Sequence, residues 1–243
     1  WKAAEGLADD VRYYGAWMRE EAWKRIGHLY PPAKVTKEMA RERADLQPYV
    51  GKELTIVAWI WARTVKSPNP AFSHVDVPLV SSFALSTKEG KQAWVEPVVH
   101  GDAYTFFVRV GSPPDQESGT KINRSNFRCL LSDVPIHSDY IRVEAQSGRM
   151  GMRLLAIAAE GPKGRIYLSP APTAEEDARR AIPSWKPDLA VTKPCHDIDR
   201  LPMYGMYTWG EAFTNRQAAA LSTYCDLVGA ARNRVLEDAI RSG

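Results

Sequence analysis

Apolar and polar positions alternate along the segment from Glu53 to Val80. In its first half, one face of an extended chain would carry leucine, isoleucine and alanine, and the other threonine, valine, tryptophan and arginine. This period of two, with β-branched and aromatic residues, predicts a strand. Pro68 and Pro70 follow it, and proline suits a turn because it cannot donate to the ladder of a central strand. The segment therefore predicts a strand, a tight turn and a second strand. The turn Ser67–Phe72 is termed the first knuckle.

A period of 3.6 residues predicts helices near both ends of the chain. From Leu7 to Leu29, apolar residues recur at intervals of three and four, and we expect this stripe to face a core. It consists of Val11, Tyr14, Trp17, Met18, Ala22, Ile26 and Leu29. Thr214 and Gln217 have capping-box spacing and open a second predicted helix that ends near Ile240. One face of this helix carries Leu221, Cys225, Val228, Ala231 and Val235.

The middle of the chain is rich in predicted strands, at residues 76–85, 93–99, 103–110, 149–159 and 165–168. A second turn, Phe127–Pro135, is termed the second knuckle. It precedes a short helix, Ser138–Gln146, with Ser138 as the expected N-cap. The predicted fold class is α+β: a β-rich middle with two ribbon-like knuckles, flanked by an N-terminal helix and a C-terminal helical segment. The predicted boundaries are 1–49 for the first helix and a linker, 50–172 for the β-rich module and 173–243 for the helical end.

Composition limits the cellular setting and the partners only loosely. The chain has 243 residues, and its formal net charge of +3 permits contact with nucleic acid without arguing for it. Three widely spaced cysteines give no disulfide framework, which predicts a reducing compartment, the cytoplasm. No apolar run approaches the ~20 residues that span a bilayer, so no membrane partner is expected. The chain begins with Trp1 and ends just after a helical pattern, and we expect it to be part of a longer polypeptide.

The common catalytic motifs are absent from the sequence. It has no G-x-G-x-x-G or P-loop glycine pattern, no G-x-S-x-G and no H-E-x-x-H. Cys195, His196 and Asp197 are adjacent, but catalytic groups are normally assembled from distant positions, so we expect a surface loop. Residues 112–115, Ser-Pro-Pro-Asp, match part of an amino-methyltransferase motif but lack its aromatic residue, and they predict a turn. We therefore predict no catalytic and no cofactor-binding residue.

Two knuckles at strand ends are also how zinc ribbons hold four thiolates. The first knuckle carries Ser67 and Phe72, and the second carries Cys129 and Ser132, so only one residue is a good ligand. A lone cysteine is more often a buried small apolar residue than a ligand. We therefore predict no metal site. The side chains that could substitute as ligands are His74, Asp133 and His137.

Basic and aromatic residues lie together around both knuckles. Such side chains can pair with phosphates and stack on bases, which predicts a nucleic-acid-binding surface. The predicted binding residues are Trp61, Arg63, Lys66, Lys121, Arg124 and Arg128. The alternative is that Trp59 and Trp61 belong to the core and that the charged side chains form a solvated rim.

Five stretches of the chain resemble a known family. They are Asp10–Pro31, Ala58–Phe72, Val77–Ser86, Asp139–Gly161 and Tyr204–Gln217. In this order they are similar to the middle part of the large adenine-specific DNA methylases that contain a zinc ribbon, a bacterial family often found with anti-phage defence genes. The resemblance implies a degenerate zinc ribbon at 50–172. Ser67 and Phe72 replace the cysteines of the first pair, and Cys129 alone remains of the second, with Ser132 beside it. Zinc is therefore not expected.

The resemblance also implies what this chain lacks. In that family the glycine-rich motif for S-adenosylmethionine precedes this region and the Asp-Pro-Pro-Tyr motif follows it, and neither is in these 243 residues. The chain is therefore expected to be a non-catalytic module of an adenine-specific DNA methyltransferase, in a restriction-modification or anti-phage setting. It would contact DNA or recognise the target, with DNA and the remaining methylase domains as partners. One alternative is a structural brace or protein-interaction module without DNA contact. Another is that the whole polypeptide is an active methyltransferase.

Overall fold

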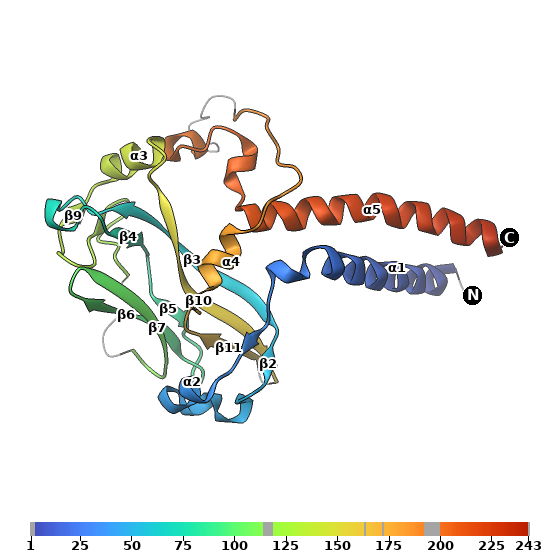
Figure 1. Ribbon diagram of the computed structural model, residues 1–243, viewed down its shortest axis with the longest axis horizontal. Helices are drawn as coiled ribbons and strands as arrows, with labels where there is room; N and C mark the ends of the chain where they lie inside the picture. The colour runs from blue at the N-terminus through green and yellow to red at the C-terminus, as the bar shows by residue number, and fades with distance from the viewer. Residues whose placement is uncertain (1–2, 114–118, 163, 172, 192–199, 243) are drawn as a thin grey trace. The chain divides into compact units, whose positions relative to one another are not determined.

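The chain has an α+β fold with antiparallel sheets and a helix near each end, as predicted (Figure 1). The computed structural model describes residues 3–113, 119–162, 164–171, 173–191 and 200–242. The α-helices are α1 (Ala3–Ile26), α2 (Lys37–Glu42), α3 (Ser138–Gln146), α4 (Ala174–Arg179) and α5 (Asn215–Ser242). Short 3-10 helices are η1 (Gly27–Leu29), η2 (Ala44–Tyr49), η3 (Pro70–Phe72), η4 (Leu201–Tyr204) and η5 (Trp209–Ala212). Among the described helices, none has both the length and the apolar content needed to cross a bilayer.

The strands of the described ranges form four antiparallel sheets, of which two are large. The larger has the order β11-β10-β3-β4, and the smaller has the order β5-β6-β7. Their strands are β3 (Ile56–Lys66), β4 (Asp76–Leu79), β5 (Ala84–Ser86), β6 (Ala93–His100), β7 (Ala103–Val110), β10 (Gly151–Gly161) and β11 (Gly164–Leu168). Two further pairs are β1 (Ala33–Lys34) with β2 (Glu53–Leu54), and β8 (Phe127–Arg128) with β9 (Pro135–Ile136).

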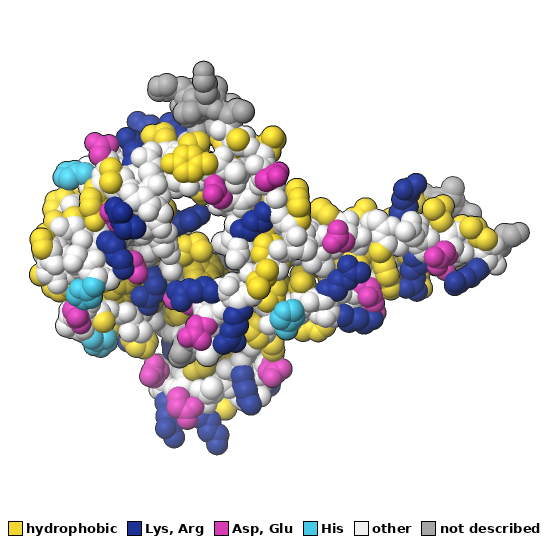
Figure 2. Space-filling view, turned by 45° about the horizontal axis from the view of Figure 1, so that its top comes forward, with side chains coloured by type: hydrophobic (Ala, Val, Ile, Leu, Met, Phe, Trp, Pro, Cys, Tyr) yellow, Lys and Arg dark blue, Asp and Glu magenta, His cyan; other side chains and the backbone are white. Residues whose placement is uncertain are grey.

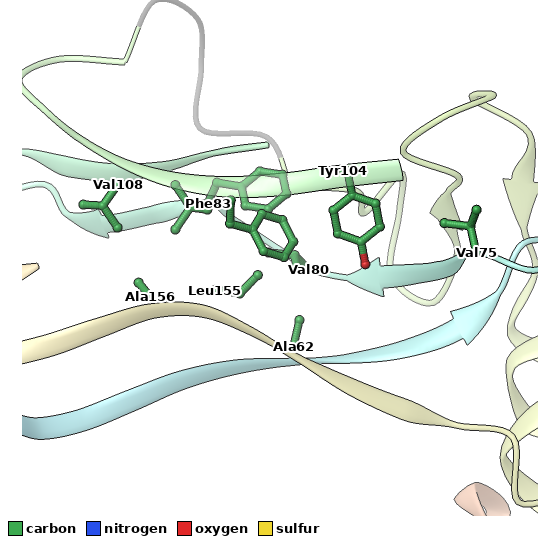
Figure 3. Packing of buried hydrophobic residues seen from close by; sticks show 10 residues of the cluster. Ala62, Val75, Val80, Phe83, Tyr104, Val108, Leu155 and Ala156 are labelled. Atoms are coloured by element: carbon green, nitrogen blue, oxygen red, sulfur yellow. The ribbon is translucent and has the colours of Figure 1, made fainter. Parts of the chain in front are cut away.

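The main core lies between the two large sheets. Tyr104 and Val108 on β7, with Phe83 just before β5, point toward the small residues Ala62 and Ala156 on β3 and β10 (Figure 3). Large side chains on one layer thus fill the space left by alanines on the other, which is how facing sheets interdigitate.

The opposite face of the larger sheet has its own core, termed the second core. Val35 and Leu46, from the segment around α2 and η2, pack there against Leu154 on β10. Trp59 and Trp61 are half-buried beside them, on the same face of β3. The segment 35–50, most of which the sequence pattern assigned to a linker, therefore covers this face of the sheet.

A third core connects the two knuckles. Val65 at the end of β3, Cys129 after β8 and Ile141 on α3 are all buried in it. The predicted helix Ser138–Gln146 is confirmed in its bounds. The predicted cap is wrong, because His137 occupies the N-cap position, and the Ser138 amide donates to Asn126 Oδ1 at 3.1 Å.

Backbone contacts divide the chain into two units that differ from the predicted segments. One unit consists of Trp1–Pro31, Glu176–Ala190 and Thr208–Gly243. The other, termed the body, consists of Pro32–Glu175 and Val191–Tyr207. The first helix therefore groups with the C-terminal helix, and the expected linker after it groups with the sheets.

Helices α1 and α5 lie side by side within the first unit and are termed the arm (Figure 1). The Tyr14 hydroxyl donates to Asp238 at 3.0 Å, and the Arg234 guanidinium lies 5.0 Å from the Trp17 ring centroid. The predicted capping box opens α5, since the amides of Gln217 and Thr214 each donate to the other's side chain. The prediction that the whole apolar stripe of α1 faces a core is wrong for Val11, which is 64% exposed.

The predicted strand 76–85 is interrupted for a tertiary reason. The Val80 amide donates to the Thr120 hydroxyl at 3.0 Å, and the Val80 carbonyl accepts from the Lys121 amide at 3.1 Å. These bonds to a distant segment draw Val80 away from the ladder, so β4 ends at Leu79 and β5 begins at Ala84.

Candidate functional site

The two knuckles meet at a contact between Ser67 and Cys129. Ser67 Oγ lies 3.3 Å from Cys129 Sγ, although the two residues are 62 positions apart in the sequence. Ser67 is 2% exposed and Cys129 is fully buried. Ser67 directly follows β3 and Cys129 directly follows β8, so the strand frame brings the two knuckles together.

The first knuckle is closed by its own backbone. The Ser67 amide donates to the Val75 carbonyl at 3.0 Å, and the Val75 amide donates to the Phe72 carbonyl at 2.9 Å. Asn69 caps the 3-10 turn, because its Oδ1 accepts the Ala71 amide at 3.0 Å. The prolines suit this turn, as predicted, and these hydrogen bonds close the knuckle.

The second knuckle is a tight turn that returns on Cys129. The Cys129 amide donates to the Val134 carbonyl, and the Asp133 amide donates to the Cys129 carbonyl, both at 2.9 Å. Asp133 has a φ of 56°, the left-handed region that aspartate tolerates better than most residues with a side chain. This conformation turns the chain sharply around the thiol.

Burial and the surrounding polar groups shift the pKa of the Cys129 thiol in opposite directions. Burial raises the pKa most, but the Ser67 hydroxyl, the nearby Ser132 hydroxyl and the backbone amides of Leu131 and Ser132 together lower it below its ordinary value. The Ser132 hydroxyl is itself buried and has no hydrogen-bond partner of ordinary geometry among the described residues. The thiol therefore lies in a small nest of donors.

The residues at the knuckles do not fit a structural zinc ion. Tetrahedral zinc with sulfur ligands places neighbouring sulfurs about 3.8 Å apart, given Zn–S bonds of about 2.3 Å. The distance between Ser67 Oγ and Cys129 Sγ is similar to this spacing. The donors are wrong, however, because a serine hydroxyl is neutral and the Phe72 ring has no donor. Phe72 packs against the main core instead.

The three substitute ligands are not gathered at the thiol. His74 Nε2 lies 3.1 Å from Asp102 Oδ2, and Asp133 lies 3.6 Å from Arg128. His137 is exposed at the start of α3. Within the described ranges, no group of three or more histidine, cysteine, aspartate or glutamate side chains could hold a metal ion.

Three of the predicted nucleic-acid-binding residues lie in one segment, 121–128, which leads into the second knuckle. Lys121, Arg124 and Arg128 are all exposed, and a bridge between Lys121 and Phe127 holds the ends of their segment together. Arg128 forms a long, exposed ion pair with Asp133 at 3.6 Å. We term these three residues the basic segment.

The structure separates the other three predicted residues. Lys66 is half-buried and held by Asp76 at 3.0 Å and by the His74 carbonyl at 2.9 Å. Arg63 is exposed on β3, on the face opposite to Lys66, because side chains alternate along a strand. Trp61 shares the face of Arg63 but packs against the second core. Lys66 is thus beside the knuckle contact, whereas Trp61 and Arg63 lie further along the strand.

Surface charge is mixed over the view in Figure 2. Lys and Arg side chains lie among Asp and Glu side chains there, and they do not merge into one continuous patch. A local cluster such as the basic segment, and not a strong overall field, would have to carry any contact with an anionic polymer.

Sequence reasoning missed the groups that complete the knuckle contact. The Asn69 amide donates to Ser67 Oγ at 3.2 Å, and the Thr120 hydroxyl ties Pro78 and Val80 to the loop before the second knuckle. No local pattern marks Thr120, because its partners are distant in the sequence. Cys195, His196 and Asp197 lie outside the described residues, as do Pro114 and Asp115.

Comparison with protein-family models, curated proteins and solved structures finds no match for this chain. The resemblance to zinc-ribbon methylases therefore stays a prediction from the sequence.

Proposed function

We propose that this chain is a non-catalytic module of a bacterial, cytoplasmic adenine-specific DNA methyltransferase, and that it contacts DNA through the basic segment. The resemblance supports the family, and the lack of both methylase motifs in the sequence supports a non-catalytic role. S-adenosylmethionine would be bound by other domains of such an enzyme, and zinc is not part of the proposal.

One observation carries the DNA contact: the exposure of Lys121, Arg124 and Arg128 in a single segment. Lys121 and Arg124 form no ion pair with a described residue, so their charges are available to phosphates. The Arg128–Asp133 pair is exposed on both sides and contributes at most about 1 kcal/mol, so a phosphate can replace the carboxylate.

Binding to duplex DNA across a salt series tests this proposal. We expect the logarithm of the affinity to fall linearly with the logarithm of the salt concentration, because each phosphate contact releases counterions. Replacing all three residues of the basic segment by glutamine should weaken binding and reduce the slope by about 2 to 3, at ~0.9 per contact. Fluorescence anisotropy with a labelled duplex measures both quantities.

A matched control removes the same charge elsewhere on the body. Lys34, Lys37 and Arg41 are exposed on β1 and α2, and their replacement by glutamine changes the net charge equally. This control should keep the slope of the unaltered chain. No binding at low salt, or equal slopes for the two triple variants, would overturn the proposal.

A second candidate function is a brace that binds other methylase domains without touching DNA. The arm favours it, because large apolar side chains are exposed along α1 and α5. These include Leu7, Val11, Leu221, Val228, Val235 and Ile240. Exposed apolar surface of this extent commonly marks a protein-binding face. Replacing Leu221 and Val228 by aspartate should then abolish association with those domains while leaving DNA affinity unchanged.

A further inference from the structure

We infer that the two knuckles are joined without a metal ion, and that the hydrogen-bonded pair Ser67–Cys129 stands where a ribbon would hold zinc. This inference is independent of the proposed DNA contact, because it concerns only how the body is held together.

The donor chemistry argues against a cation between the knuckles. A structural zinc site is normally completed by four donors, most of them thiolates or imidazoles. Here Cys129 supplies one thiol, Ser67 and Ser132 supply neutral hydroxyls, and Phe72 supplies nothing. Partial retention of ligands would leave the ion's charge poorly balanced in a buried site, which is unfavourable.

The Ser67 side chain has its polar partners without an ion. Buried polar atoms need partners, and Ser67 Oγ has two, the Cys129 thiol and the Asn69 amide. The Ser132 hydroxyl is the buried polar group here that has no hydrogen-bond partner of ordinary geometry among the described residues. The direct polar contact between the knuckles is therefore made by Ser67 and Cys129.

Apolar packing closes the rest of the site. The third core surrounds Cys129 with Val65, Val77, Ile136 and Ile141, all of them buried. Phe72 at the end of the first knuckle packs into the main core against a different set of side chains. A metal at the contact would have no fourth ligand unless Phe72 left that core.

A double-mutant cycle measures the contact directly. The variants are Ser67→Ala, Cys129→Ala and the double variant, unfolded in urea with EDTA present throughout. We expect the two effects on the unfolding equilibrium constant to be coupled by about fivefold, as for a buried hydrogen bond. Should Cys129→Ala not fold, Cys129→Val replaces it, since valine also lacks a group that can pair with the Ser67 hydroxyl. Additive effects would overturn the inference.

Metal content tests the same inference independently. Elemental analysis of the purified chain should find less than about one zinc per ten molecules, since one good thiolate of four remains. The melting temperature should be unchanged by EDTA. Stoichiometric zinc, or a fall in melting temperature of several degrees on chelation, would overturn the inference.

Restoring the missing thiols tests whether the contact stands in a metal position. Ser67→Cys, Phe72→Cys and Ser132→Cys together should give a chain that binds one Co²⁺, with the thiolate-to-metal absorption of a tetrahedral site. Ser147→Cys, an exposed thiol at the end of α3, is the control and should not bind. If the triple variant does not fold, Ser67→Cys with Ser132→Cys keeps Phe72 in the core and should still bind Co²⁺. Folded variants that bind no cobalt would overturn this part of the inference.

Discussion

The body and the arm bury different kinds of side chain. In the body, large apolar residues such as Leu154, Ile157 and Leu168 are at most 3% exposed. In the arm, the buried apolar residues are mostly alanines, among them Ala22 and Ala231, and Leu227 is the large apolar exception among the described residues. Large residues of the arm are instead exposed, and Val228 is 61% exposed.

This difference shows where each region obtains its stability. Full burial of a large apolar side chain contributes about 1.5–3 kcal/mol, so the body is held by its own cores. The arm gains little from alanines and is held in addition by polar contacts such as Tyr14–Asp238. The arm thus exposes much of its large apolar side-chain surface, whereas the body buries large apolar side chains in its own cores.

The largest expected effect compares one leucine from each region. Leu154→Ala removes a side chain of β10 that is 1% exposed and lies in the second core. It should lower the free energy of unfolding by about 3–5 kcal/mol. Leu221→Ala removes a leucine that is 52% exposed on α5, and should change it by less than about 0.5 kcal/mol. Urea unfolding followed by circular dichroism measures both changes. Equal losses would show that the arm is packed as tightly as the body.

A smaller effect is expected when a buried polar side chain of the body is compared with an exposed one of the arm. Glu175 is mostly buried, and its Oε1 accepts from Arg153 at 3.0 Å and from the Leu154 amide at 2.7 Å. Glu175→Ala should therefore cost about 1–3 kcal/mol in urea unfolding, because a buried amide loses its acceptor.

Asp9→Ala in the arm is the matched control for Glu175→Ala. Asp9 pairs with Arg12 at 2.7 Å, but both side chains are more than half exposed, so the change should be within about 0.5 kcal/mol. A loss at Asp9 as large as that at Glu175 would contradict the proposed difference between the regions.

The sequence pattern was sufficient for elements whose signals are local. Strand β3, helix α3, the hairpin of β10 and β11 and the capping box before α5 all follow from period, turn residues and caps. The break after Leu79 did not follow, because Val80 is bonded to Thr120 and Lys121, forty or so residues away.

The site was predictable only as a pair of turns. Spacing indicated that the two knuckles belong together, and the Ser67–Cys129 contact agrees with this. The pattern could not tell that Lys66 would bind Asp76, or that Val11 would be exposed, because both depend on what covers each face. A period identifies a face, whereas burial depends on the tertiary partner of that face.

The smallest expected effect concerns one exposed ion pair of the arm. The hydrogen bond from Lys24 Nζ, at 2.6 Å, holds the pKa of the Glu21 carboxyl below its ordinary value. A carboxyl with a lowered pKa in the folded state stabilises that state above its unfolded pKa, and this contribution is lost as the pH falls through the folded value. The melting temperature of the unaltered chain should therefore exceed that of Glu21→Gln by a small, constant amount above about pH 5, and the difference should shrink below about pH 4. Lys24→Gln is the matched variant, and in it the carbon-13 titration of Glu21 should return toward the ordinary range. A difference that stays constant down to pH 3 would show that the pair does not couple to folding.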